Sequence, residues 1–254
     1  MSDRVIVITG ASSGIGAALA ERLAARGDAT ALVARREPAL REVAARCGER
    51  ALPLVADVTS REAVRRVVHD AIARFGHVDV WVNNAGRGIS RPVTQLTDDD
   101  VDEMMRVNVK SALYGIQEIL PHFVERGSGQ IINVSSMLGR APSASFRSAY
   151  NGAKAFLNAI TANLRDELRE TQPGITVSLV SPGVVSTDFG NSAKHGGPDS
   201  RLLPMSQAVE EVADVIVRVI DTRATDVYTR PGMRQHALDY LARLGADPPE
   251  GQSA

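Results

Sequence analysis

The chain has 254 residues, 44% of them hydrophobic and 23% charged, with a formal net charge of -1, which is typical of a globular protein and lacks the basic excess that a nucleic-acid partner requires. Its one cysteine, Cys47, excludes an internal disulfide and a cysteine metal cluster, and its histidines show no metal-ligand spacing. No apolar run approaches the roughly 20 residues that span a bilayer, and the first predicted strand begins within a few residues of Met1, so we expect no membrane segment, no signal peptide and a cytoplasmic location.

Short apolar runs alternate with segments of helical periodicity along the chain. Strands are predicted at 4–9, 29–34, 51–56, 78–82, 130–134, 175–180 and 226–230. Helices are predicted at 15–26, 37–46, 61–75, 98–125, 150–170 and 207–221. This alternation predicts an α/β fold in which helices cover both faces of a parallel sheet. The irregular stretch 184–205, rich in Gly, Ser and Pro, is predicted to be a mobile substrate lid within one domain, 1–254.

The turn between the first strand and the first helix reads TGASSGIG at 9–16. Glycines let the backbone turn sharply and approach a ligand closely, and a helix start offers free N–H groups to a pyrophosphate. The G-x-x-x-G-x-G spacing differs from the common dinucleotide fingerprint, but its strand–turn–helix context is the same. A structural turn that binds nothing is the alternative. The predicted cofactor contacts here are Gly10, Ser12, Ser13, Gly14, Ile15 and Gly16.

The end of the second strand indicates which nucleotide would bind. An acidic residue there would hold the ribose 2′-OH of NAD, whereas arginine suits the 2′-phosphate of NADP. Ala34 occupies the acidic position and is followed by Arg35 and Arg36, so we predict NADP(H) ahead of NAD(H). Solvated loop charges are the alternative. Asp57, followed by Val58, is placed to accept a hydrogen bond from adenine, or to begin the next helix.

Small residues and amides follow the fourth predicted strand as NNAG at 83–86. We predict that Asn84, Ala85 and Gly86 both contact the cofactor and brace the neighbouring strand.

Tyr150 and Lys154 stand four residues apart at the start of a predicted helix, so both side chains lie on one face. A nearby cation favours the phenolate and lowers the pKa of the phenol towards neutrality. Ser136 ends the apolar run IINVSS, where its hydroxyl can reach the same reacting oxygen. This combination predicts proton transfer at an alcohol or ketone oxygen, although Y-x-x-x-K alone is frequent in helices.

Six motifs together resemble the short-chain dehydrogenase/reductase family, in the right order over about residues 4 to 230. They are TGASSGIG at 9–16, NNAG at 83–86, Asn108 in RVNV, Ser136 in NVSS, YNGAK at 150–154 and SPG at 181–183. The resemblance implies a single-domain doubly wound Rossmann fold with a seven-stranded parallel sheet. It also implies a homotetramer or homodimer built through the helices near 100–125 and 150–170.

The resemblance further assigns roles to individual residues. Tyr150 would be the general acid/base, Lys154 would lower its pKa and hold the nicotinamide ribose, and Ser136 would bind the substrate oxygen. Asn108 would hold a water in a proton relay through Lys154. The separation of Ser136 from Tyr150, 14 positions, is slightly longer than usual in the family, so Ser135 is the alternative to Ser136. Contacts at the nicotinamide end would come from Pro182, Gly183, Val185 and Thr187.

These features favour an NADP(H)-dependent oxidoreductase that transfers hydride between nicotinamide and a carbonyl or secondary alcohol. A 3-oxoacyl-[acyl-carrier-protein] reductase is the alternative, and the intact catalytic residues argue against a non-catalytic NADP(H)-binding sensor. The predicted substrate contacts are Ser136, Met137, Leu138, Phe146 and Tyr150, a largely apolar set that favours a hydrophobic substrate. Whether an anionic substrate binds the four arginines that flank the pocket is left open. These are Arg87, Arg91, Arg140 and Arg147.

Overall fold

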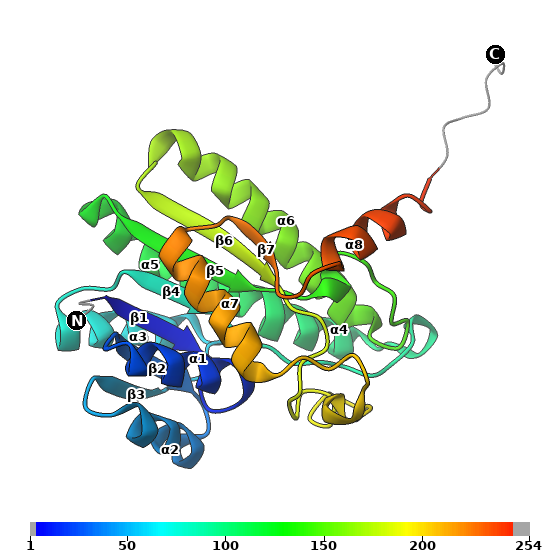
Figure 1. Cartoon of the computed structure of the whole chain (residues 1–254), viewed down its shortest axis with the longest axis horizontal. Coiled ribbons are helices and arrows are strands. Elements are labelled where there is room, and N and C mark those ends of the chain that lie inside the picture. Colours follow the sequence, from blue (N-terminus) through cyan, green and yellow to red (C-terminus); the bar gives the residue numbers. More distant parts are fainter. Residues whose placement is uncertain (1–3, 246–254) are drawn as a thin grey trace.

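The computed structural model describes residues 4–245, so residues 1–3 and 246–254 of the predicted domain lie outside the described residues. Seven parallel strands form one sheet in the order β3-β2-β1-β4-β5-β6-β7, which confirms the predicted fold (Figure 1). The strands are β1 (Val5–Thr9), β2 (Ala29–Ala34), β3 (Ala51–Val55), β4 (Val80–Asn83), β5 (Gly129–Val134), β6 (Ile175–Ser181) and β7 (Asp226–Tyr228).

Helices cover both faces of the sheet (Figure 1). The helices are α1 (Gly14–Ala25), α2 (Glu37–Cys47), α3 (Arg61–Phe75), α4 (Asp98–Met105), α5 (Ser111–Arg126), α6 (Ser148–Thr171), α7 (Val209–Thr222) and α8 (Met233–Leu241). The predicted helix 98–125 is divided by a π-helical segment, Arg106–Lys110, and α8 was not predicted.

Alternate side chains of each strand enter two separate cores, as the period-two geometry of a strand requires. Ile6 and Ile8 of β1 pack with α1, α2 and α7, whereas Val5 and Val7 pack with α3, α5 and α6. Because both faces are buried, the strands are continuous apolar runs. Pro53 is tolerated because β3 lies at the edge of the sheet, where a strand position without an N–H donor costs least.

The strand order reverses between β1 and β4. In open α/β sheets, ligands bind beyond the carboxyl ends of the strands at such a point. The predicted functional segments follow β1, β4, β5 and β6, and therefore gather at this edge. Among residues 4–245, none of the helices combines the length and the apolar character needed to cross a bilayer.

Candidate active site

Tyr150 and Lys154 lie in the first two turns of α6, and both side chains are buried, with 7% and 3% of their surfaces exposed. Lys154 Nζ donates to the carbonyl oxygen of Val134, 2.9 Å away, at the end of β5. The same atom lies 5.8 Å from the centre of the Tyr150 ring. The i,i+4 spacing predicted from the sequence therefore does bring the two side chains together inside the protein.

Burial controls the protonation of both groups. Burial raises the pKa of Tyr150 to about 12, against the lowering effects of a hydrogen bond with Ser136 and the charge of Arg147. Burial also lowers the pKa of Lys154 to about 8. The charge of Arg147 lowers the pKa of Tyr150 against burial, and the role of Lys154 in lowering that pKa stays a prediction. Lys154 points to a backbone carbonyl and is itself poorly solvated.

The structure separates the two candidate serines after β5. Ser135 Oγ donates to Asn158 Oδ1 on α6, so its hydroxyl is engaged in joining β5 to that helix. Ser136 Oγ accepts from the Leu138 N–H at 3.1 Å. A hydrogen bond between the Ser136 side chain and the Tyr150 phenol also lowers the pKa of that phenol. Of the two serines, Ser136 is therefore the one that interacts with Tyr150, and its contact with substrate stays a prediction.

Asn108 is 1% exposed and lies in the π-helical segment, where the Ser111 N–H bonds to the Arg106 carbonyl five residues back. Single π-turns of this kind often occur at functional sites. Both the oxygen and the nitrogen of the Asn108 side-chain amide are hydrogen-bonded. Oδ1 accepts from the Arg87 N–H at 3.1 Å, and Nδ2 donates to the Arg87 and Met104 carbonyls.

Gly86 lies beside both Asn108 and Lys154. A Cβ atom at Gly86 would stand 2.9 Å from Asn108 Oδ1 and 3.6 Å from Lys154 Nζ. The predicted catalytic amide and ammonium are therefore both close to this glycine.

The glycine-rich turn has the tight geometry that its residues predict. Gly10 and Gly14 have positive φ angles of 70° and 55°, which favour glycine. A Cβ at Gly16 would come within 2.7 Å of Asn84 Nδ2 and would also strike the Gly10 carbonyl. Asn84 Nδ2 donates to the Thr9 carbonyl at 2.9 Å, and the Asn84 and Ala85 N–H groups both donate to Thr9 Oγ1. The predicted bracing by the NNAG motif is thus present.

The two arginines after β2 differ in their surroundings. Arg36 Nη2 donates to the hydroxyls of Ser12 and Ser13 at 3.2 Å and 2.8 Å, and no carboxylate of the described chain forms an ion pair with it. Arg35 is turned to Asp57, with 3.8 Å between Nη1 and Oδ2.

Asp57 shapes the turn before α3, and its contact with adenine stays a prediction. Partial burial acts to raise the pKa of Asp57, but hydrogen bonds from the Thr59 N–H and hydroxyl keep that pKa below its usual value. The carboxylate thus turns the chain before α3, while the true N-cap of α3 is Ser60. The neighbouring Val58 packs against the core between the sheet and α3, α5 and α6.

The segment 184–205 lies over the predicted site. Thr187 Cγ2 would stand 3.2 Å from a Cβ at Gly14, so this threonine covers the glycine-rich turn. The Phe189 ring meets the Tyr150 ring edge-on, with 5.4 Å between centroids.

The residues just before this segment are also fixed by contacts. The Pro182 carbonyl accepts from the Met137 N–H at 2.7 Å. A Cβ at Gly183 would strike Met233 at the start of α8. Val185 pairs as a short β-bridge with Gln207. Each of these positions is therefore held by a contact with another segment, and their role at the nicotinamide end stays a prediction.

Of the predicted substrate residues, the structure groups some and separates others. Leu138 packs with Tyr150, Ile89 and Phe189. Met137 instead packs with Ala237 of α8 in a separate cluster, because the turn after Ser136 directs it away from the phenol. Phe146 is 41% exposed, with the Arg147 guanidinium 5.3 Å from its ring centre. The apolar set predicted around the substrate is therefore only partly assembled.

Three of the four flanking arginines are ion-paired. Arg87 pairs with Glu103 at 2.6 Å, and Arg91 pairs with Asp100 at 2.8 Å. Arg140 pairs with Asp226. Arg147 makes none of these ion pairs, yet it is only 7% exposed.

Asp100 lies in the first turn of α4 and also binds side chains of the segment 184–205. It is 1% exposed, forms a capping box with Thr97, and binds Lys194 and His195 from the segment 184–205 at 2.9 Å and 3.0 Å. Burial acts to raise the pKa of Asp100, but its hydrogen bonds outweigh burial and hold that pKa well below its usual range. His195 thus joins the segment 184–205 to the start of α4.

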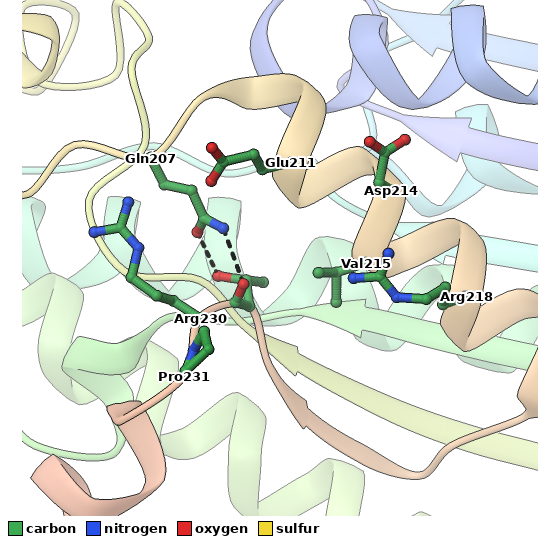
Figure 2. Close-up of a pocket in the computed structure, with 8 residues that line it drawn as sticks. Gln207, Glu211, Asp214, Val215, Arg218, Arg230 and Pro231 are labelled. Atoms are coloured by element: carbon green, nitrogen blue, oxygen red, sulfur yellow. Dashed lines mark hydrogen bonds between the residues drawn. The ribbon is translucent and has the colours of Figure 1, made fainter.

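A polar depression of about 500 Å³ lies apart from this site (Figure 2). Glu211, Asp214 and Arg218 of α7 line one side of it, and Arg230 lines the other. The Gln207 amide closes its floor through two hydrogen bonds to Thr229. None of the predicted catalytic residues lines this depression. Within residues 4–245, no three His, Cys, Asp or Glu side chains form a group that could hold a metal ion.

Comparison with known proteins agrees with this geometry. Residues 4–196, more than half of the chain, match the short chain dehydrogenase family. The chain belongs to this family. It is 33% identical over 231 residues to an uncharacterized oxidoreductase of Staphylococcus epidermidis, covering 91% of this chain and 98% of the relative.

Two solved structures of similar proteins contain a nicotinamide cofactor. A short-chain dehydrogenase from Sphingobium yanoikuyae in complex with NADPH has a TM-score of 0.81 and 31% identity, covering 99% of this chain and 98% of that one. The 3-ketoacyl-(acyl-carrier-protein) reductase of Brucella melitensis, complexed with NADH, has a TM-score of 0.79 and 27% identity, covering 88% and 96%.

Sequence reasoning missed one feature of this site. Phe189 packs on Tyr150, but nothing in the local sequence around Phe189 has a distinctive period. Arg147 was named only as one of four flanking arginines, and the structure singles it out by its burial. Its place three residues before Tyr150 could have identified it as a neighbour on the same helix face.

Proposed function

We propose that the protein is an NADP(H)-dependent oxidoreductase that transfers hydride between nicotinamide and a carbonyl or secondary alcohol. The observation that carries the proposal is the burial of Ser136, Tyr150 and Lys154 together, beside the glycine-rich turn at the carboxyl edge of the sheet. Membership of the short chain dehydrogenase family and similarity to a structure with NADPH support it.

In this proposal, the bound cofactor supplies or accepts the hydride. The Ser136 hydroxyl holds the substrate oxygen, and the Tyr150 phenol donates a proton to that oxygen during reduction or removes it during oxidation. A phenol whose pKa is raised to about 12 is fully protonated at neutral pH, so the unliganded protein is ready to act as the acid in ketone reduction.

The other two catalytic residues support the phenol. Lys154, with its pKa lowered to about 8 by burial, holds the ribose and returns the proton to Tyr150. Asn108 holds the water that links Lys154 to solvent. Oxidation needs the phenolate form of Tyr150, and the positive charge of Arg147 favours that form by lowering the pKa of the phenol.

The residues present fit a phosphorylated dinucleotide. Glycines at 10, 14 and 16 keep the turn free of side chains above the start of α1, where N–H groups favour a pyrophosphate. The exposed Arg36 guanidinium bridges Ser12 and Ser13, which places a cation beside the ribose end of such a ligand. Asp57 would accept from adenine, and the segment 184–205 would close over the nicotinamide.

A 3-oxoacyl-[acyl-carrier-protein] reductase is the second candidate, supported by the similarity to the Brucella melitensis reductase. We also propose a homodimer or homotetramer through α5 and α6. Val124 on α5 and Phe156 on α6 support this, because both are large apolar side chains that are 41% and 48% exposed in the single chain.

The cofactor assignment is tested by titrating the purified protein with NADPH and with NADH. Replacing Arg36 with Ala should weaken NADPH binding about 10- to 100-fold, the value of one or two charge-assisted hydrogen bonds, and leave NADH binding unchanged. Arg35→Ala should have a smaller effect, because Arg35 is turned to Asp57. The exposed Arg66→Ala is the matched control. Equal or tighter binding of NADH by the wild type would overturn the assignment.

A further inference from the structure

Arg147 is a buried cation without a counter-ion. Its side chain is 7% exposed, and its Nη1 donates one hydrogen bond, to the Ile89 carbonyl at 3.3 Å. The guanidinium also lies 5.3 Å from the centre of the Phe146 ring. Among residues 4–245, no carboxylate lies within ion-pair distance of it. Burial accordingly lowers the pKa of Arg147, because an unpaired charge is costly inside a protein.

The nearby carboxylates are already used by other cations. Asp100 is bound by Arg91, Lys194 and His195. Glu103 is bound by Arg87 and again by Lys194. Three permanent cations thus share two carboxylates, and neither carboxylate has an ion pair with Arg147. The region beneath the segment 184–205 therefore has an excess of positive charge.

A second group without a partner lies beside Arg147. The Ser90 hydroxyl is buried and makes no hydrogen bond. A Cβ at Gly197 would stand 2.7 Å from Ser90 Oγ and 3.0 Å from Arg147 Nη2. Ser90 Oγ and Arg147 Nη2 therefore both lie close to one point beside Gly197. The Gly190 carbonyl would be 2.9 Å from the same point, so the segment that carries both glycines has to shift when an anion enters.

This point lies next to the proposed chemistry. Arg147 and Tyr150 are three residues apart at the start of α6, and residues so spaced on a helix have Cβ atoms about 5–6 Å apart. Phe189 lies against the Tyr150 ring and also against Gly88, where a Cβ would be 2.9 Å from both the Phe189 ring and Arg147 Nη1. Tyr150 and Arg147 are therefore covered by the same segment.

We propose that Arg147 and Ser90 form a carboxylate-binding subsite, and that the substrate is an oxo acid or the corresponding hydroxy acid. The carboxylate lies a few bonds from the reacting carbon, and Ile89 and Leu138 contact the apolar remainder. A guanidinium presents its N–H groups as a fork that matches a carboxylate, and the Ser90 hydroxyl adds a third donor. This inference rests on the proposed function, because it names the substrate class of the same site.

The experiment compares the charged acid and the neutral ester of each of three ketones. Oxidation of NADPH is followed with pyruvate, acetoacetate and levulinate, and with the methyl ester of each. We expect the wild type to favour at least one acid over its ester by about 10- to 100-fold in kcat/KM, the value of a charge-assisted hydrogen-bond pair. In Arg147→Gln this preference should vanish through a higher KM for the acid alone. Any change in kcat that follows from removing the Arg147 charge beside Tyr150 should be equal for acid and ester.

Two further variants separate binding from folding. Ser90→Ala removes a hydroxyl that has no partner to lose, so the protein should fold normally and show a KM for the acid raised about 3- to 10-fold, the value of one hydrogen bond. Arg147→Lys should recover part of the preference. Arg169→Gln, at a side chain 70% exposed, is the matched control, and thermal melting verifies that every variant is folded.

Each unfavourable outcome has a distinct meaning. If the wild type reduces ketones but treats acid and ester alike, the carboxylate subsite is refuted while the proposed function stands. If Arg147→Gln changes kcat and the pH profile but keeps the wild-type preference for the acid over the ester, Arg147 acts only through Tyr150, and the subsite is again refuted. If NADPH binds but no ketone of either charge is reduced, the proposed function itself fails.

Discussion

Lys154 carries a free-energy cost that should be measurable in the unfolding of the protein. Its ammonium is buried, and burial alone lowers its pKa from 10.5 to about 8. Replacing Lys154 with Met removes this cost, but it also leaves the Val134 carbonyl without the donor that now lies 2.9 Å away. A buried acceptor without a partner costs about 1–3 kcal/mol. The two effects nearly cancel at neutral pH, so the decisive quantity is how their difference depends on pH.

The sign follows from proton linkage. Between pH 8 and 10.5 the unfolded chain binds a proton at Lys154 that the folded protein has lost, so the stability of the wild type rises with pH in that window. Each pKa unit corresponds to about 1.4 kcal/mol. The wild type should therefore gain about 2 kcal/mol relative to Lys154→Met between pH 7 and pH 9.5, because the variant has no ammonium to deprotonate.

The assay is urea unfolding at both pH values, for the wild type, for Lys154→Met and for Lys110→Met. Lys110 is exposed, so its variant should follow the wild type at both pH values. Other titrations are common to all three proteins and cancel in the comparison. A difference between the wild type and Lys154→Met that stays constant across this range would show that Lys154 is not desolvated, and the reasoning about both buried groups would then be incorrect.

Two further variants test the site and its cover. Tyr150→Phe should bind NADPH as the wild type does and lose turnover by at least about 10²-fold, the usual value of a positioned acid; turnover near that of the wild type would remove Tyr150 from its role. Asp100→Asn leaves Lys194, Arg91 and His195 without their buried carboxylate, and should cost about 3–5 kcal/mol of stability at pH 7. Because the folded-state pKa of Asp100 is depressed, this difference should persist down to about pH 4 and shrink below it, as the unfolded wild type takes up a proton that the folded wild type does not. A difference that does not depend on pH in urea melts at pH 7 and pH 3 would contradict the ion-pair account.

Local patterns in the sequence were enough to predict the architecture. Apolar runs alternating with amphipathic segments define a parallel sheet covered on both faces, and the order of the motifs places them at the carboxyl ends of β1, β4, β5 and β6. The i,i+4 spacing likewise fixes Tyr150 and Lys154 on one helix face, since helix geometry is local. The π-helical turn at Asn108 and helix α8 were missed because their sequences, RVNVK and MRQHALDYL, carry no local signal that separates them from ordinary helix or loop.

Charge pairing and burial were decided only by the tertiary structure. The sequence shows four arginines near the pocket, and nothing local indicates which of them has a carboxylate partner. The partners Glu103 and Asp100 lie on α4, and Asp226 begins β7. Whether a guanidinium is neutralised or left unpaired in the interior therefore depends on segments far apart along the chain.

The pKa values of Tyr150 and Lys154 likewise depend partly on local sequence and partly on the tertiary structure. The sequence determined that a phenol and an ammonium face the same way, because that follows from helical spacing. The fold decided how deeply both are buried and that Lys154 bonds to the end of β5. Burial opposes charge on either group, so it raises the pKa of Tyr150 and lowers that of Lys154, an outcome that depends on solvent exclusion by the whole fold.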